Sequence, residues 1–376
     1  MKLKAVGIHI FAGLFTRGVI DAGFDPVMVL EDGQFGVDTH RFNFPNTPVV
    51  VGRDLWPVAQ LRSEAIDLVY SNSPCAGFSV ANASRGSENE INSCLDYSSK
   101  IARAIRPKVY MVESVASLFT EGDAMVRKWE HAWRSIGYKT CRLLESSELL
   151  GLPQIRKRAV FVAAQANIDF MHPPAWQLPA TTVRNAIYDL VNEPLGFGPA
   201  PYKHMSTSVY ELSMRGNSTL LSWHIPGEVS AAIRAIVPHL KPGKRADSLS
   251  EEVLDSTYRI ARLKPIKAKG RPSLLFRRLD WDKPSVVLTG AAHWFHPEHD
   301  RLLTIREQAR LMGVPDNFGF GSQSKTRPYA ELGKAVSPVV GRWLAQHAVQ
   351  FCRKPEQRVH HNELDLSRAA IAKASK

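Results

Sequence analysis

The sequence predicts a doubly wound α/β domain into which a smaller, loop-rich domain is inserted. Short apolar runs alternate with helical patterns over residues 1–165, at the spacing of successive βαβ units. Between residues 166 and 300 prolines cluster and the periodicity fades, and a regular helical pattern returns at Thr304. Because alternating strands and helices build a parallel sheet covered on both faces, we expect such a sheet in the first segment.

Four short apolar runs predict the strands of this sheet. They cover residues 6–11, 27–30, 66–70 and 109–112. The second run ends on an acidic pair, and the first leads directly into a glycine-containing turn. Open α/β sheets bind their ligands where the strands end in this way, at the carboxyl edge of the sheet.

Helices are predicted where apolar residues recur at three- or four-residue spacing. One is expected over residues 123–136, and its inner face would carry Met125, Trp129 and Trp133. Thr304 and Glu307 form a capping box that begins another helix. A last helix is expected over residues 337–351, with Pro338 in its first turn.

Reactive side chains follow several of the predicted strands. The third run leads into Cys75, and the fourth ends on Glu113. Arg156 and Arg158 lie just before a further apolar run. A nucleophile, a carboxyl group and two arginines therefore meet at one edge of the sheet. This combination suits covalent attack on a heteroaromatic ring.

The composition indicates a globular protein with a polyanionic partner. The 376 residues are 44% hydrophobic, enough for a substantial core, and carry a formal net charge of +12. Such a basic excess favours nucleic acid as the partner. No stretch approaches the roughly 20 apolar residues that span a bilayer. Because the N-terminus begins with a strand pattern and shows no signal-peptide cleavage site, we expect a cytoplasmic protein without a membrane partner.

The cysteines show neither a metal-binding nor a disulfide pattern. All four lack CxxC spacing, so no zinc site, other metal site or disulfide framework is expected. Only Cys75 lies within a motif. The three that we expect to be ordinary thiols are Cys94, Cys141 and Cys352.

The order of these motifs resembles that of the DNA (cytosine-5) methyltransferase family over nearly the whole chain. Any one motif is weak evidence, but six in the right order are strong. The resemblance implies a Rossmann-like fold that binds S-adenosylmethionine. The positions that match the cofactor motifs are Phe11, Ala12 and Gly13, then Glu31 for the ribose and Asp54 for the adenine, and Asp32 beside Glu31 is a further cofactor-binding candidate.

The catalytic motifs match in the same order. Pro74 and Cys75 resemble the family's Pro-Cys loop, and Glu113 begins the Glu-Asn-Val motif. The pattern Gln-x-Arg-x-Arg covers residues 154–158, and residues 301–316 are similar to the ninth motif. The tenth motif, which in the family packs beside the cofactor, is represented by Gly333, Lys334, Ala335 and Val336.

The resemblance implies the chemistry of these residues. Cys75 would add to carbon 6 of a flipped cytosine and thereby activate carbon 5, with nearby arginines favouring its thiolate. Glu113 would contact N3 and the exocyclic amine. Arg158 would hold the O2 side of the base, and Arg156 would support the loop or bind a phosphate.

Each of these residues also has a structural interpretation. Cys75 could be a small buried thiol, and Glu113 could cap a helix. The arginines could be solvated charges, and Glu31 and Asp54 could be acids on surface turns. Phe11 could pack against the sheet instead of against adenine.

The resemblance also implies how the chain is divided into domains. Residues 1–165 would be the catalytic cofactor-binding domain and residues 166–300 the target-recognition domain. Residues 301–352 would return to the catalytic domain, and residues 353–376 would be a flexible basic tail. The partner would be double-stranded DNA, bound by a monomer in a bacterial or phage-infected cell. Candidate phosphate contacts are Lys241, Lys244, Arg245, Lys264, Lys267, Lys269 and Arg271.

The chain departs from the family pattern around the expected cofactor pocket. Phe15 and Thr16, followed by Arg17, replace the Gly-Gly of the first motif, and Ser114 replaces an Asn. Lys334 replaces the Asn of the tenth motif, and a cation there would repel a sulfonium.

One hypothesis explains that cation by a different cofactor. Lys334, with Arg17, would pair with the carboxylate of carboxy-S-adenosylmethionine, and the product would be 5-carboxymethylcytosine. Alternatively, Lys334 turns to solvent or pairs with Glu331. Two other interpretations of the protein's function are a DNA-binding homologue without activity and a tRNA cytosine methyltransferase.

Overall fold

The chain folds into two compact units. The computed structural model describes residues 2–75, 77–78, 90–165, 180–250, 252–253, 276–290 and 294–352. Unit 1 comprises Met1–Gly151, Arg156–Pro179 and Ala335–Lys376, and unit 2 comprises Leu152–Ile155 and Ala180–Lys334. Residues 301–334, which the sequence grouped with the C-terminal return, therefore belong to unit 2, and the chain re-enters unit 1 at Ala335.

Unit 1 is built on a seven-stranded mixed sheet with the order β3-β2-β1-β4-β5-β7-β6. Neighbouring strands are parallel from β3 to β5, whereas β7 runs antiparallel to β5 and β6. The strands are β1 (Leu3–Ile8), β2 (Phe24–Glu31), β3 (Val49–Val51), β4 (Leu68–Ser71), β5 (Val109–Val115), β6 (Tyr138–Ser146) and β7 (Lys157–Gln165). The predicted α/β class is confirmed.

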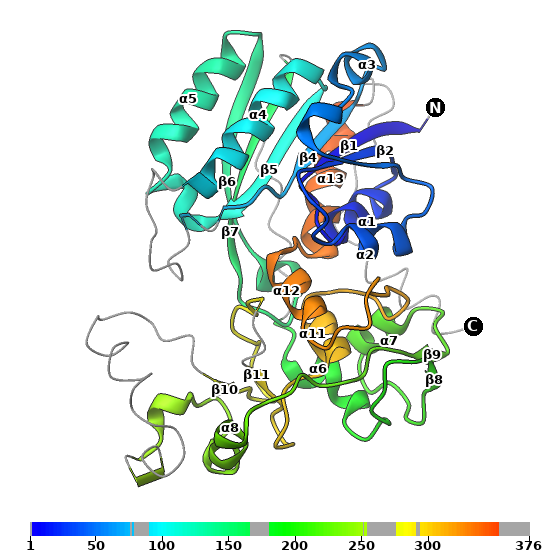
Figure 1. Cartoon of the computed structure of the whole chain (residues 1–376), viewed down its shortest axis with the longest axis vertical. Coiled ribbons are helices and arrows are strands. Elements are labelled where there is room, and N and C mark those ends of the chain that lie inside the picture. Colours follow the sequence, from blue (N-terminus) through cyan, green and yellow to red (C-terminus); the bar gives the residue numbers. More distant parts are fainter. Residues whose placement is uncertain are drawn as a thin grey trace. The chain divides into compact units, whose positions relative to one another are not determined.

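Helices cover both faces of this sheet (Figure 1). On one face α5 packs Trp129 and Trp133 against Phe161 and Tyr110 of the sheet. On the other face Phe15 of α1 packs edge-on against Tyr70, with the ring centroids 5.0 Å apart. The helices of unit 1 are α1 (Leu14–Asp21), α2 (Val37–Asn43), α3 (Val58–Ser63), α4 (Ser93–Ile105), α5 (Asp123–Arg134) and α13 (Pro338–Cys352).

Helices α1 and α13 approach closely because glycines lie at their contact. A Cβ atom added to Gly18 would lie 2.4 Å from the carbonyl oxygen of Pro338, and one added to Gly341 would lie 2.8 Å from the ring of Phe15. Side chains at these positions would push the helices apart. The helix predicted over residues 337–351 is confirmed, and it packs against α1, the helix that follows the turn after β1.

The sheet has a topological switch point at β1. From β1 the order runs to β2 and β3 in one direction and to β4 and β5 in the other. In open α/β sheets ligands bind at the carboxyl ends of the strands on either side of such a reversal. The turn after β1 and the loop after β4 lie at this point, so the fold brings two of the predicted motifs to one edge.

The first strand ends earlier than its apolar pattern predicts. The run over residues 6–11 predicts a strand as far as Phe11, but β1 ends at Ile8. His9 and Phe11 each have a φ of 55°. This left-handed conformation interrupts extended backbone, and for a bulky residue such as Phe it is strained. Surrounding contacts must therefore hold the turn in place.

Within the residues that the structure describes, unit 2 consists of short helices and two small sheets, as the fading periodicity predicts. Helix α11 begins with the predicted capping box of Thr304 and Glu307 and packs against α6. The helices are α6 (Val183–Ile187), α7 (Val209–Arg215), α8 (Ala231–Ile236), α11 (Ile305–Leu311) and α12 (Arg327–Lys334). The paired strands are β8 (Ala200–Pro201) with β9 (Leu220–Leu221), and β10 (Arg277–Arg278) with β11 (Trp294–Phe295).

Several expectations fall on residues that the structure does not describe. These are the basic tail over residues 353–376 and the candidate phosphate contacts Lys264, Lys267, Lys269 and Arg271. Among the helices of the described residues, none is both long enough and apolar enough to cross a membrane.

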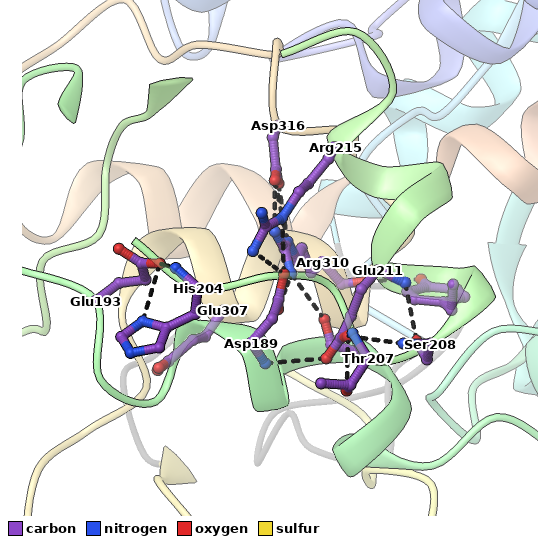
Figure 2. Close-up of polar contacts among 12 residues, drawn as sticks. Asp189, Glu193, His204, Thr207, Ser208, Glu211, Arg215, Glu307, Arg310 and Asp316 are labelled. Atoms are coloured by element: carbon purple, nitrogen blue, oxygen red, sulfur yellow. Dashed lines mark hydrogen bonds and ion pairs between the residues drawn. The ribbon is translucent and has the colours of Figure 1, made fainter. Parts of the chain in front are cut away.

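A buried cluster of charges holds unit 2 together (Figure 2). Arg310 of α11 is fully buried and donates to Asp316 at 2.9 and 2.6 Å and to Asp189 at 2.5 Å. Asp189 also accepts a hydrogen bond of 2.8 Å from Arg215. Burial raises the pKa of Asp316, but Arg310 outweighs this and holds it at about 2. The guanidinium of Arg310 thus joins the segments on either side of it.

Replacing Arg310 with methionine should destabilise the protein strongly. Asp189 and Asp316 would stay buried without the charge between them, and breaking a buried ion pair costs about 3–5 kcal/mol in the free energy of unfolding. Urea denaturation followed by circular dichroism would measure this. Lys325→Met, which breaks an exposed pair with Glu228, is the control. Equal losses for the two variants would contradict the prediction.

Candidate active site

Cys75 lies half-buried in the loop that follows β4. Burial raises the pKa of its thiol, and the negative charge of Glu113 raises it further. The positive charge of Arg158 and the nearby polar groups of Ser114 and Val115 act in the opposite direction and lower the pKa. The arginine therefore favours the thiolate, as the sequence predicts, but burial and the carboxylate outweigh it. The pKa of the Cys75 thiol therefore lies above its ordinary value.

Glu113 lies near the end of β5 and is 2% exposed. Its Oε1 atom accepts from Arg158 Nε at 2.8 Å, and its Oε2 atom accepts from Asn72 Nδ2 at 2.9 Å. Burial raises the pKa of this carboxyl group, and the charges of Arg158 and Arg156 only partly offset it. Asn72, which the sequence analysis missed, fixes the orientation of the carboxyl group.

The two arginines of the Arg-x-Arg pattern differ in their surroundings. Arg158 of β7 lies opposite Val115 of β5. Because alternate residues of a strand share a face, Val115 and Glu113 lie on one face of the sheet, and Arg158 projects on that same face. Arg156 is 4% exposed, and its Nη2 atom donates to the carbonyl oxygen of Ala335 at 3.1 Å. Burial, reinforced by the like charge of Arg158, lowers the pKa of Arg156 to about 9. Arg156 thus anchors the start of the returning chain, where Val336 is also buried.

A buried acid that sequence reasoning missed lies behind these arginines. Glu145 of β6 pairs in register with Arg158 of β7 and is 7% exposed. Burial raises the pKa of Glu145 to about 8, and Glu113 adds to the shift while Arg158 and Arg156 oppose it. The sequence gives little signal for this acid, because β6 also carries Lys139 and Arg142, and only the spacing of two residues from the buried Leu143 places Glu145 on the inward face.

Glu31 holds the turn after β1 from the end of β2. Its Oε1 atom accepts backbone N–H groups from Ile10 at 2.5 Å and Phe11 at 2.8 Å. Burial raises the pKa of Glu31 to about 8, although these two hydrogen bonds lower it. Phe11 is half-buried and lies edge-on to Phe35. Ala12 is buried beneath the turn, and Gly13 has a φ of 85°.

Beside this turn, the carboxylate of Asp32 contacts the side chains of Arg53 and His9. Its carboxylate accepts from Arg53 at 2.8 and 2.5 Å and lies 3.0 Å from His9 Nε2. Partial burial raises the pKa of Asp32, but His9 and Arg53 outweigh it and hold the pKa far below its ordinary range. Asp54 lies next to Arg53 in an exposed 3-10 turn. His9 was not predicted as a site residue.

The residues that replace the glycine pair face the interior of unit 1. Phe15 and Thr16 are buried, and Thr16 Oγ1 lies 2.9 Å from the hydroxyl of Tyr70. Arg17 forms an ion pair with Asp21, one turn further along α1. The structure therefore directs Thr16 into the core and Arg17 along the helix surface.

Lys334 is the last residue of α12 and is exposed. It belongs to unit 2, and the next residue, Ala335, belongs to unit 1. Glu331, a candidate partner for Lys334, accepts a hydrogen bond of 3.1 Å from Arg327. Among the described residues there is no group of histidines, cysteines and acids that could hold a metal ion.

Sequence comparison places this chain within one family. A model of the C-5 cytosine-specific DNA methylase family matches residues 7–350. The chain is 27% identical to the type II methyltransferase M1.HphI of Haemophilus parahaemolyticus, across 93% of this chain and 88% of the relative. It is 24% identical to M.DdeI of Desulfomicrobium norvegicum, across 90% and 87% of the two chains. The chain belongs to the C-5 cytosine-specific DNA methylase family, and it is a DNA (cytosine-5-)-methyltransferase.

Solved structures share its fold at low sequence identity. A DNA modification methyltransferase encoded within an Escherichia coli prophage superposes with a TM-score of 0.73 at 20% identity, covering 94% of this chain and all of that one. DNMT2 of Spodoptera frugiperda gives a TM-score of 0.59 at 12% identity, covering 92% and 99%. The fold is therefore retained although most side chains differ.

Proposed function

We propose that this protein transfers a methyl group from S-adenosylmethionine to carbon 5 of cytosine in double-stranded DNA, with Cys75 as the nucleophile. The observation that carries the proposal is the placement of a thiol, a carboxyl group and two guanidinium groups at one edge of the sheet in unit 1. Cys75 and Glu113 interact electrostatically, and Arg158 lies 2.8 Å from Glu113. The motif order alone would be compatible with a chain that had lost this geometry.

The turn after β1 fits the nucleoside part of the cofactor. Only the Oε1 atom of Glu31 is used by the backbone of the turn, and its Oε2 atom has no hydrogen-bond partner among the described residues. A ribose offers two hydroxyl donors to such an oxygen. Phe11 offers a half-buried ring for the adenine, and Asp54 an exposed carboxylate nearby. Bound S-adenosylmethionine supplies an electrophilic methyl group.

Glu113 provides a route for activating the thiol. When the proton of Cys75 passes to Glu113, one acid ionises as the other is neutralised, so the charge of the site does not change. A neutral Glu113 no longer raises the pKa of Cys75. Its carboxyl group can then donate to N3 while Sγ bonds to carbon 6 and the ring electrons move toward carbon 5.

After methyl transfer, the covalent bond to the protein must break again. Transfer of the proton from carbon 5 to solvent restores the double bond of the ring and expels the Cys75 thiolate, and N3 returns its proton to the Glu113 carboxylate. Arg158 contacts Glu113 and so holds the carboxyl group in place throughout. Arg156 is committed to the Ala335 carbonyl, so we assign it a positioning role rather than a phosphate contact.

DNA would be bound partly by unit 2. Lys241 and Lys244 are exposed there and can reach phosphates. Arg245 is half-buried and hydrogen-bonded to Asp247 at 2.6 and 3.2 Å, so its charge is already compensated. The target base must leave the duplex, which costs roughly a few kcal/mol. Contacts between the protein and the opened DNA must offset this cost.

Nucleoside mass spectrometry tests the proposal directly. The purified protein would be incubated with S-adenosylmethionine and either mixed-sequence duplex DNA or transfer RNA, and the nucleic acid would then be digested. We expect 5-methylcytosine in the DNA and none above background in the RNA. A folded protein that binds S-adenosylhomocysteine but modifies neither substrate would favour the DNA-binding homologue instead.

Lys334 supports a second candidate cofactor, carboxy-S-adenosylmethionine. A charged hydrogen bond between its ammonium and the cofactor carboxylate would contribute ~1.5–3 kcal/mol, or at least a ~10-fold preference. With both cofactors in one reaction, Lys334→Asn should raise the ratio of 5-methylcytosine to 5-carboxymethylcytosine by that factor. Lys325→Asn, on an exposed lysine of unit 2, is the control. An unchanged ratio would remove this candidate.

A further inference from the structure

A row of polar side chains connects the end of β2 with the loop that carries Cys75, and it is buried at His9, Ser71 and Ser73 and reaches the surface at the exposed Asp32. Ser71 Oγ lies 2.8 Å from Ser73 Oγ, and Ser73 Oγ lies 2.7 Å from Nδ1 of His9. On its other side, His9 Nε2 lies 3.0 Å from Asp32 Oδ1. His9 and Ser73 are each 1% exposed. One imidazole therefore contacts both ends of the connection, through its two ring nitrogens.

Each end of this row of polar side chains adjoins a part of the proposed active site. Ser73 directly precedes Pro74 and Cys75, and proline limits the backbone freedom between them. Asp32 directly follows Glu31, the residue proposed to hold the cofactor ribose. A shift of the Asp32 carboxylate would therefore be transmitted through a rigid ring to the loop of the nucleophile.

The surroundings hold His9 in a single position. Its backbone N–H donates to the carbonyl oxygen of Leu30 at 2.9 Å, and its φ of 55° is maintained within a tight turn. Its ring lies against Trp56, with centroids 5.6 Å apart. Asp32 is itself fixed by Arg53, whose guanidinium stacks 4.3 Å from the ring centre of Tyr97. A ring held this firmly is suited to transmit position and unsuited to act as a mobile proton carrier.

Ser73 itself is not placed to act as a nucleophile, although Ser, His and Asp side chains are combined here. Its hydroxyl is buried and is hydrogen-bonded on both sides, by Ser71 and His9. A substrate could not reach it without opening the end of β4. The arrangement therefore serves the neighbouring Cys75 loop.

We propose that His9 is a positioning residue that couples occupancy of the cofactor site to the placement of the Cys75 loop, through Asp32 on one side and Ser73 on the other. This inference rests on the proposed function, because it assigns the two ends of the connection to cofactor and nucleophile. It predicts that Asp32 and Ser73, which share no direct contact other than through His9, behave as a coupled pair.

A double-mutant cycle tests the coupling. Asp32→Asn, Ser73→Ala and their combination would be made in the natural chain and again with His9→Phe, which keeps a ring but removes both polar contacts. The measurements are kcat for DNA methylation and the Kd of S-adenosylhomocysteine. With His9 present, the combined loss should be smaller than the product of the single losses by ~3–10-fold. With His9→Phe, the losses should multiply.

Ser99→Ala provides a matched control for the serine. Ser99 is equally buried and its hydroxyl accepts from Trp133 Nε1 at 3.1 Å, in the core between α4 and α5. Its effect should multiply with that of Asp32→Asn in both backgrounds. If His9→Phe fails to fold, His9→Asn replaces it, because the shorter side chain cannot reach both partners.

The binding measurement keeps this inference separate from the proposed function. Ser73→Ala should weaken S-adenosylhomocysteine binding when His9 is present and leave it unchanged with His9→Phe, whether or not the protein turns over. Independent effects of Asp32→Asn and Ser73→Ala in the natural background would overturn the coupling. Absence of 5-methylcytosine from the natural protein would instead count against the proposed function.

Discussion

Replacing Cys75 with alanine should abolish methylation of DNA while leaving the fold intact. Without the sulfur no covalent bond to carbon 6 can form, and carbon 5 stays too weakly nucleophilic to accept the methyl group. We expect the rate to fall below ~10⁻³ of that of the natural protein, the scale on which removal of a covalent nucleophile acts in other enzymes. The rate of 5-methylcytosine formation, measured by mass spectrometry, checks this.

A trapping experiment separates the nucleophile from the binding surface. Duplex DNA containing 5-fluorocytosine cannot lose its substituent from carbon 5, so the natural protein should form a stable adduct and Cys75→Ala should not. Cys141→Ala serves as the control, because Cys141 is a half-buried thiol in β6, outside the proposed site. An adduct that still forms with Cys75→Ala would show that another residue is the nucleophile.

The strand ends could be predicted because apolar runs mark parallel strands clearly. The run before Cys75 and the run ending on Glu113 became β4 and β5, and topology alone then brought their ends together. The returning helix was equally clear, since Pro338 begins it and its apolar stripe continues to the end. Each of these signals is local, and each agrees with the fold that the family shares.

The side-chain contacts between segments that are distant in sequence could not be predicted from the local pattern. His9 lies inside an apolar run and would be expected to point into a strand, but a left-handed backbone turns it toward Asp32 and Ser73. Glu145 would pass as a surface residue of β6 until the register with Arg158 is known. Both depend on contacts between segments distant in sequence, which periodicity does not report.

Substitutions in the expected cofactor pocket show the same limit. Arg17 has a charge that could serve a ligand carboxylate, yet its helical spacing to Asp21 pairs it along α1. Thr16 lies in a motif close to the cofactor in the family, yet it is hydrogen-bonded inside unit 1. A position in a motif therefore indicates a neighbourhood, whereas the direction of the side chain depends on the packing around it.

Replacing Glu113 with glutamine should change two properties of the site in opposite directions. Glutamine cannot donate a carboxyl proton to N3, so kcat should fall by ~10²–10⁴-fold, the range for loss of a general acid or base. At the same time the negative charge that raises the pKa of Cys75 disappears. The pKa of the thiol should therefore fall, and a larger fraction of Cys75 should be thiolate at a given pH.

Alkylation by iodoacetamide reports that second effect independently of methylation. The rate at which Cys75 is modified in the free protein, followed by peptide mass spectrometry across pH, should rise at lower pH in Glu113→Gln than in the natural protein. Glu121→Gln, on an exposed acid beyond β5, should leave both the alkylation and the methylation unchanged. If Glu113→Gln slowed methylation but left the thiol titration in place, the carboxyl group would act on the base alone. A reactive thiol in a slow enzyme would instead establish that Glu113 governs both steps, because it restrains the nucleophile until the base arrives to take its proton.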